Sequence, residues 1–146
     1  MLRLHCVRRI CPSQVFLRTL SSNNPKVYSF DDVRKMVEHT PKSTVLVDVR
    51  EPRELESYEM PNAINIPLQS APGALSLNNN EFEELFHFPK PPKDKELVFF
   101  CLKGIRAKAA EELARSYGYE KTAVYPGSIS EWLAKGGEKV KPKNEP

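Results

Sequence analysis

Cysteine is scarce in this chain, and it is unevenly placed. There are three cysteines in 146 residues, and two of them, Cys6 and Cys11, lie close to the N-terminus. If that terminus is removed, Cys101 is the only thiol left, and a single thiol can form neither an internal disulfide nor a cysteine-based zinc site. His39 and His87 have no spacing typical of metal ligands. We therefore expect no metal and no other cofactor.

Long hydrophobic runs are also lacking. No stretch approaches the roughly 20 consecutive apolar residues that a membrane-spanning helix needs, so no membrane span is expected. Hydrophobic residues make up 40% of the chain and charged residues 28%, which is an ordinary balance for a globular protein. The length suits one domain with a short extension.

Acidic residues are missing from the first 24 positions. The first acidic residue is Asp31, and the segment before it contains Arg3, Arg8, Arg9 and Arg18. An acid-poor N-terminus with Arg and Ser is typical of mitochondrial or plastid targeting. Arg18 stands two residues before Leu20, as at a matrix-protease site, so we expect residues 1–20 to be a presequence and the mitochondrial matrix to be the location. A basic tail without a targeting role is the alternative.

The positive charge of the chain comes from this same segment. The whole chain has a net charge of +3, and without the four N-terminal arginines the remainder carries about −1. The remainder therefore lacks the basic excess of a nucleic-acid-binding surface, and no nucleic-acid partner is expected.

Short apolar runs alternate with helical patterns from residue 25 onward. We expect strands over 27–28, 44–49, 63–66, 96–100 and 122–125, and helices over 30–38, 50–55, 81–88, 104–117 and 128–134. Such alternation predicts an α/β fold, with a central parallel sheet of about five strands and helices on both faces. The domain should span residues 25–137, and residues 138–146 should form a flexible basic tail.

Cys101 follows the strand expected over residues 96–100. Ligands bind beyond the carboxyl ends of the strands in such sheets, so Cys101 should lie at the edge where active sites occur. The residues after it, Leu102, Lys103, Gly104, Ile105, Arg106 and Ala107, join that strand to the start of a helix. Unpaired N–H groups at a helix N-terminus bind anions, and Gly104 allows the backbone to curl around one point.

This loop predicts a reactive cysteine. Helix N-termini and nearby cations lower a thiol pKa from about 8.5 to roughly 3.5–7.5, so we expect Cys101 to be largely thiolate at neutral pH. Lys103 adds a positive charge on a mobile side chain, and Arg106 adds a planar guanidinium group with donors in fixed positions. Asp48, at the end of a neighbouring strand, is the acid best placed to pair with Arg106. Taken alone, Asp48 would more often be a strand-end cap, and a lone Cys after a strand a small buried hydrophobe.

Four segments, in this order, are similar to those of one enzyme family. They are residues 47–51 (VDVRE), 60–67 (MPNAINIP), 101–106 (CLKGIR) and 125–128 (YPGS) with Trp132. On these segments the chain resembles single-domain rhodaneses, which are thiosulfate sulfurtransferases, and most of all the small mitochondrial rhodaneses of fungi. The resemblance covers about residues 25–137. One departure is Asn62, where the family often has Gly, and there we expect a changed backbone detail.

The resemblance implies a rhodanese-like fold and a sulfur-transfer mechanism. The Cys101 thiolate would attack the outer sulfur of thiosulfate, release sulfite and become a persulfide, in ping-pong catalysis. Residues 102–107 would bind the anion, with Asp48 and Arg50 in support. The acceptor would be glutathione, thioredoxin or cyanide, and the residues do not distinguish among the three.

Two other functions are alternatives, of which the first fits the residues less well and the second remains open. Cysteine-dependent phosphatases and arsenate reductases resemble this loop, but they have five residues between Cys and Arg, whereas Cys101 and Arg106 have four between them. A shorter loop suits a single sulfur better than a tetrahedral oxyanion. The second alternative is a persulfide carrier that delivers sulfur to a partner protein with little turnover of small molecules.

Overall fold

A computed structural model describes residues 24–143, and the predicted presequence lies outside them. The strands are β1 (Lys26–Val27), β2 (Thr44–Asp48), β3 (Ala63–Asn65), β4 (Glu96–Phe100) and β5 (Thr122–Val124). The α-helices are α1 (Phe30–Glu38), α2 (Pro52–Leu55), α3 (Asn79–Phe86), α4 (Ile105–Ser116) and α5 (Ser128–Ala134), with short 3₁₀ turns η1 (Ala74–Ser76) and η2 (Gly137–Lys139).

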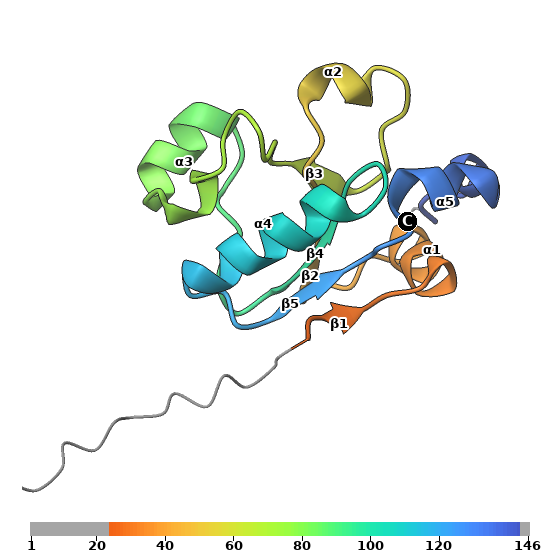
Figure 1. Cartoon of the computed structure of the whole chain (residues 1–146), viewed down its shortest axis with the longest axis horizontal. Helices are drawn as coiled ribbons and strands as arrows, with labels where there is room; N and C mark the ends of the chain where they lie inside the picture. Colours follow the sequence, from red (N-terminus) through yellow and green to blue (C-terminus); the bar gives the residue numbers. More distant parts are fainter. Residues whose placement is uncertain (1–23, 144–146) are drawn as a thin grey trace, which may run out of the picture.

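The five strands form one sheet in the order β1-β5-β4-β2-β3, and every neighbouring pair is parallel. β4 lies at the centre, and β2 pairs with it along its whole length, so that Asp48 is opposite Phe100. The carboxyl ends of the strands therefore meet at one edge of the sheet, with α2 above it (Figure 1). The predicted parallel sheet of five strands is confirmed.

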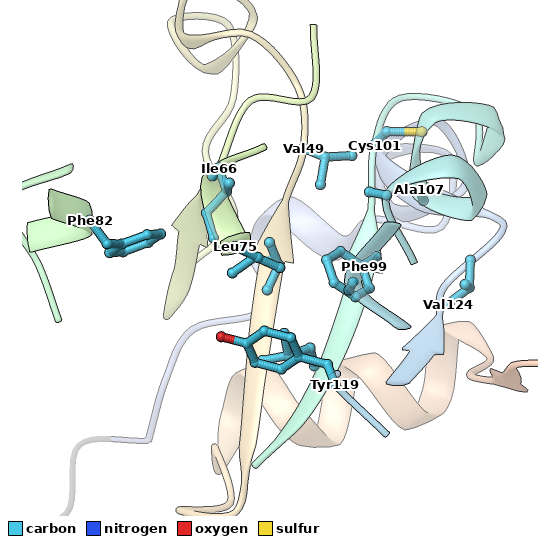
Figure 2. Packing of buried hydrophobic residues seen from close by; sticks show 14 residues of the cluster. Val49, Ile66, Leu75, Phe82, Phe99, Cys101, Ala107, Tyr119 and Val124 are labelled. Carbon is cyan, nitrogen blue, oxygen red and sulfur yellow. The ribbon is translucent and has the colours of Figure 1, made fainter. Parts of the chain in front are cut away.

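Helices cover both faces of this sheet, each over its own hydrophobic core. Alternate residues of β4 point to opposite faces, because side chains alternate along a strand. Leu97 and Phe99 belong to the core that includes residues of α3 and α4, and Figure 2 shows Phe99 near Ala107 of α4. Val98 and Phe100 belong to the core that includes residues of α1 and α5. Burial on both faces explains why β4 reads as a continuous apolar run.

Local signals place most helix boundaries. α1 begins after Ser29, whose side chain accepts a hydrogen bond from the Asp32 N–H in a capping box. α3 starts two residues earlier than the predicted residue 81, because Asn78 caps it in the same way with Glu81. α2 is shorter than predicted and begins at Pro52, which suits the first turn of a helix.

The residues after α5, up to residue 143, include most of the predicted flexible tail. η2 packs closely against Trp132, because a side chain on Gly137 would collide with the Trp132 ring. Val140 packs against the core on the α1 side, and the Lys143 N–H donates to the Glu38 carbonyl at 3.0 Å. Residues 138–143 are thus in contact with the domain.

Candidate active site

Cys101 leaves the end of β4 and is held on both of its backbone groups. Its carbonyl accepts the Ile129 N–H at 3.0 Å, and its own N–H donates to Ser128 Oγ at 3.1 Å. The residue is only 2% exposed. Figure 2 shows its sulfur at the upper end of the packed core, beyond Phe99 and above Ala107. The structure thus places Cys101 at the predicted edge of the sheet.

Gly104 closes the loop back on the sulfur. It has φ 98, in the left-handed region that favours glycine, and its N–H donates to Cys101 Sγ at 3.0 Å. A side chain at Gly104 would collide with the Pro126 carbonyl. The backbone therefore curls as predicted, with an N–H group at the start of α4 directed at the sulfur.

Ser128 is a site residue that sequence reasoning missed. Its hydroxyl donates to the Tyr125 carbonyl at 2.8 Å, accepts the Cys101 N–H, and lies 3.9 Å from Cys101 Sγ. Ser128 is fully buried and has φ 53, an uncommon conformation for a residue with a side chain. The signal was present in the YPGS segment, where Gly127 and Ser128 lie between a strand and a helix.

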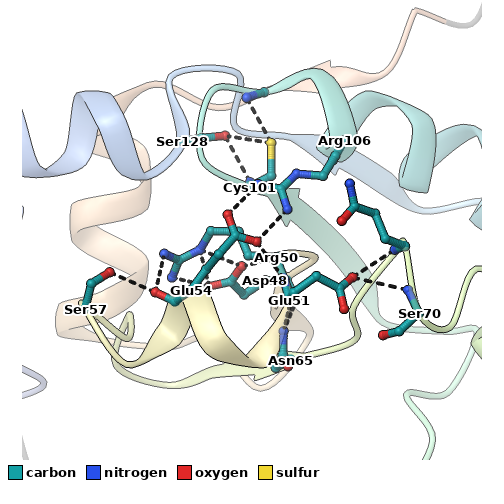
Figure 3. Close-up of polar contacts among 12 residues, drawn as sticks. Asp48, Arg50, Glu51, Glu54, Ser57, Asn65, Ser70, Cys101, Arg106 and Ser128 are labelled. Carbon is teal, nitrogen blue, oxygen red and sulfur yellow. Dashed lines mark hydrogen bonds and ion pairs between the residues drawn. The ribbon is translucent and has the colours of Figure 1, made fainter.

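Arg106 does not pair with Asp48, so that part of the prediction is wrong. Its Nη1 donates to Glu54 Oε2 at 2.7 Å and its Nη2 to Glu54 Oε1 at 2.8 Å, in a bidentate ion pair (Figure 3). These hydrogen bonds from Arg106 lower the pKa of Glu54 from 4.5 to about 2. The pKa of Arg106 is raised, mainly by its hydrogen bonds to Glu54.

Asp48 instead pairs with Arg50, and this explains the error. Arg50 Nη2 lies 2.7 Å from Asp48 Oδ2, and both side chains are 2% exposed. The same guanidinium donates to the Glu54 carbonyl at 3.3 Å and to the Tyr58 carbonyl at 2.9 Å. Asp48 thus holds the Arg50 guanidinium in place. Arg50 in turn donates to two carbonyls of the α2 segment, and this segment positions Glu54 beside Arg106.

The other loop residues point in different directions. Lys103 is exposed, and Ile105 is 82% exposed. Leu102 is 38% exposed, while its carbonyl accepts the Ser130 N–H at 3.0 Å. The side chain of Ala107 is fully buried in the core under α4. Of the predicted loop residues, the structure therefore brings Gly104 directly to the sulfur and places Arg106 in the adjoining ion pair.

Comparison with known proteins identifies the family. The rhodanese-like domain matches residues 29–135 of this chain. The chain belongs to the rhodanese-like domain family. This confirms the resemblance and the fold predicted from the four segments.

Relatives of this rhodanese-like domain are sulfurtransferases. The chain is 64% identical over 127 residues to the mitochondrial thiosulfate sulfurtransferase RDL2 of Saccharomyces cerevisiae, covering 87% of this chain and 85% of that protein. It is 42% identical over 118 residues to the thiosulfate:glutathione sulfurtransferase of the same yeast, covering 81% of this chain and 85% of that protein. The mitochondrial name of RDL2 confirms the predicted organelle, whereas the matrix stays a prediction.

Solved structures agree with this assignment. The crystal structure of the yeast single-domain sulfurtransferase RDL2 has a TM-score of 0.79 at 65% identity and covers 81% of this chain and 96% of that chain. The human single-domain sulfurtransferase TSTD1 has a TM-score of 0.67 at 35% identity, over 75% of this chain and 96% of that chain.

Two features of residues 24–143 concern metal ions and membranes. In that range no group of three or more His, Cys, Asp or Glu side chains is arranged to hold a metal ion. Within the same residues, every helix is too short or too polar to cross a bilayer.

Proposed function

We propose that this protein is a thiosulfate sulfurtransferase that carries sulfur as a persulfide on Cys101. One observation carries the proposal: the Gly104 N–H donates to Cys101 Sγ at 3.0 Å. This donor stands at the start of the twelve-residue helix α4, where the backbone stabilises negative charge. The relatives named as thiosulfate sulfurtransferases support the same chemistry.

In the first half-reaction the Cys101 thiolate attacks the outer sulfur of thiosulfate. The new S–S bond forms as the bond between the outer sulfur and the sulfonate sulfur breaks, and sulfite leaves with that electron pair. Charge is conserved, because a monoanionic thiolate and a dianionic donor give a monoanionic persulfide and dianionic sulfite. The Gly104 N–H stabilises the anionic sulfur on Cys101, and Arg106 and Lys103 attract the donor.

In the second half-reaction an acceptor thiolate attacks the outer sulfur of the persulfide, and Cys101 leaves as a thiolate. Glutathione is the acceptor that we propose, because a relative at 42% identity is named a thiosulfate:glutathione sulfurtransferase. A thioredoxin thiolate would attack in the same way, and cyanide would attack the same sulfur through its carbon and leave as thiocyanate. Neither half-reaction needs a general base if both attacking sulfurs are ionised.

Steady-state kinetics with thiosulfate and glutathione test this proposal. We expect sulfite release without any partner protein, and parallel lines in double-reciprocal plots, because the two substrates react in separate half-reactions. Cys101→Ser is the inactive control. Intersecting lines would contradict two separate half-reactions, and turnover only with an added partner protein would identify a carrier. Hydrolysis of p-nitrophenyl phosphate faster than sulfite release would favour a phosphatase.

A further inference from the structure

The guanidinium group of Arg106 already binds a carboxylate. Both of its terminal nitrogens donate to the Glu54 carboxylate, at 2.7 and 2.8 Å. A carboxylate and the sulfonate end of thiosulfate offer similar paired oxygens to such a group. Arg106 cannot hold both with the same two nitrogens, so the carboxylate and the donor compete for it.

Resting on the function proposed above, we infer that Glu54 sets the affinity for the sulfur donor by occupying Arg106 until the donor anion displaces it. Glu54 acts through Arg106 and is therefore a positioning residue. When sulfite departs, the carboxylate returns to Arg106, which favours release of this second anion over its retention beside the persulfide.

The segment that carries Glu54 is short and lies at the surface. α2 has four residues, none of them buried. Polar contacts help to hold it: the Arg50 guanidinium donates to the Glu54 carbonyl, and the Glu51 carboxylate accepts the backbone N–H groups of Gln69 and Ser70. Elements held by few apolar contacts are the ones that open locally.

Glu54 keeps a second hydrogen-bond donor after an anion displaces it from Arg106. The Glu51 N–H donates to Glu54 Oε2 at 2.8 Å, as part of the capping box of α2. The carboxylate is also 27% exposed, so that water solvates it on release. Displacement therefore leaves no buried unpaired charge, which lowers the free-energy cost of exchanging one anion for another on Arg106.

The ion pair also adjoins the reacting atom. Cys101 is only 2% exposed while Glu54 and Arg106 are paired, and Figure 3 shows the pair lying against the Cys101 loop. Thiosulfate must reach a sulfur that is nearly closed to solvent. Displacement of Glu54 by the donor would couple donor binding to opening of the site.

Sulfate binding tests this inference without turnover. Calorimetry is done with inorganic sulfate on the Cys101→Ser protein, with and without Glu54→Gln. If Glu54 competes for Arg106, its removal tightens sulfate binding by about three- to tenfold, because the binding-competent fraction rises. If Glu54 merely orients Arg106, its removal weakens sulfate binding. In the enzyme with Cys101 intact, Glu54→Gln should lower KM for thiosulfate and leave KM for glutathione unchanged.

Two further variants make the result unambiguous. Glu38→Gln removes the same charge from an ion pair with Lys143 and should leave sulfate affinity within about twofold of the parent. Glu54→Asp keeps the charge on a shorter side chain and should tighten binding by less than Glu54→Gln, which keeps the test open if the glutamine variant fails to fold. Unchanged or weaker binding in both Glu54 variants, or no sulfate binding at all, overturns the inference. Absence of a persulfide in the wild type would refute the proposed function while leaving this result intact.

Discussion

Gly104 combines two constraints at a single residue. Its positive φ directs the N–H group toward Cys101 Sγ, and its missing side chain makes room for the Pro126 carbonyl. The first constraint was predictable from a glycine at a strand–helix junction. The second was not, because Pro126 comes from a distant part of the sequence. The same reason hid Ser128, which reaches Cys101 from 27 residues away.

Gly104→Ala should abolish most of the activity. The new Cβ combines a strained backbone conformation with a collision against backbone, so we expect a loss of about 2–4 kcal/mol in the free energy of unfolding and more than about tenfold in sulfite release. Gly136→Ala is the matched control, because Gly136 has φ 77 but a Cβ added there would meet nothing within 4 Å. Equal activity in the two variants would refute the role of Gly104.

Among the elements, α2 has a position that could not be predicted from the sequence. The periodic patterns predicted α1, β4 and α5 with the bounds that the structure has. The partner of Arg106 could not be predicted, because Glu54 reaches it only through the position of α2. That position depends on Arg50, which is held by Asp48 and which binds two carbonyls of the α2 segment.

Asp48→Asn should release this segment. It leaves the buried Arg50 guanidinium without an acid, and breaking a buried ion pair on one side costs about 3–5 kcal/mol. Urea unfolding gives the loss of stability, and hydrogen exchange should rise over residues 51–58. Asp31→Asn, in an exposed pair with Arg34, is the control and should cost less than about 1 kcal/mol. Equal effects of the two variants would contradict the network.

The ion pair between α2 and α4 should make stability depend on pH. The pKa of Glu54 is about 2 in the folded protein against 4.5 as the ordinary value. A lowered pKa contributes stability that is fully present above about pH 4.5 and is lost as pH falls toward 2. Wild type should therefore exceed Glu54→Gln by about 1–3 kcal/mol in unfolding free energy at pH 7, with a smaller difference at pH 3. A gap that does not shrink at pH 3 would contradict this pairing.

For the whole molecule, the parallel sheet explains how distant segments meet. The ends of β2, β4 and β5 share one edge, and Arg50, Cys101 and Ser128 follow these strands in the chain. The order of strands and helices predicted this edge, because parallel α/β sheets place sites at the carboxyl ends.

Asn62 was expected to change the backbone, yet its φ of 62 lies in the left-handed region that glycine favours and asparagine tolerates.

Intact-protein mass spectrometry tests the central claim most directly. After incubation with thiosulfate and removal of excess donor, the wild type should gain about 32 Da, the mass of one sulfur atom, as a persulfide. The added mass should disappear on treatment with glutathione and should be absent from Cys101→Ser. A wild-type protein that gains no mass, or a Cys101→Ser protein that gains the same mass, would contradict a persulfide carried on Cys101.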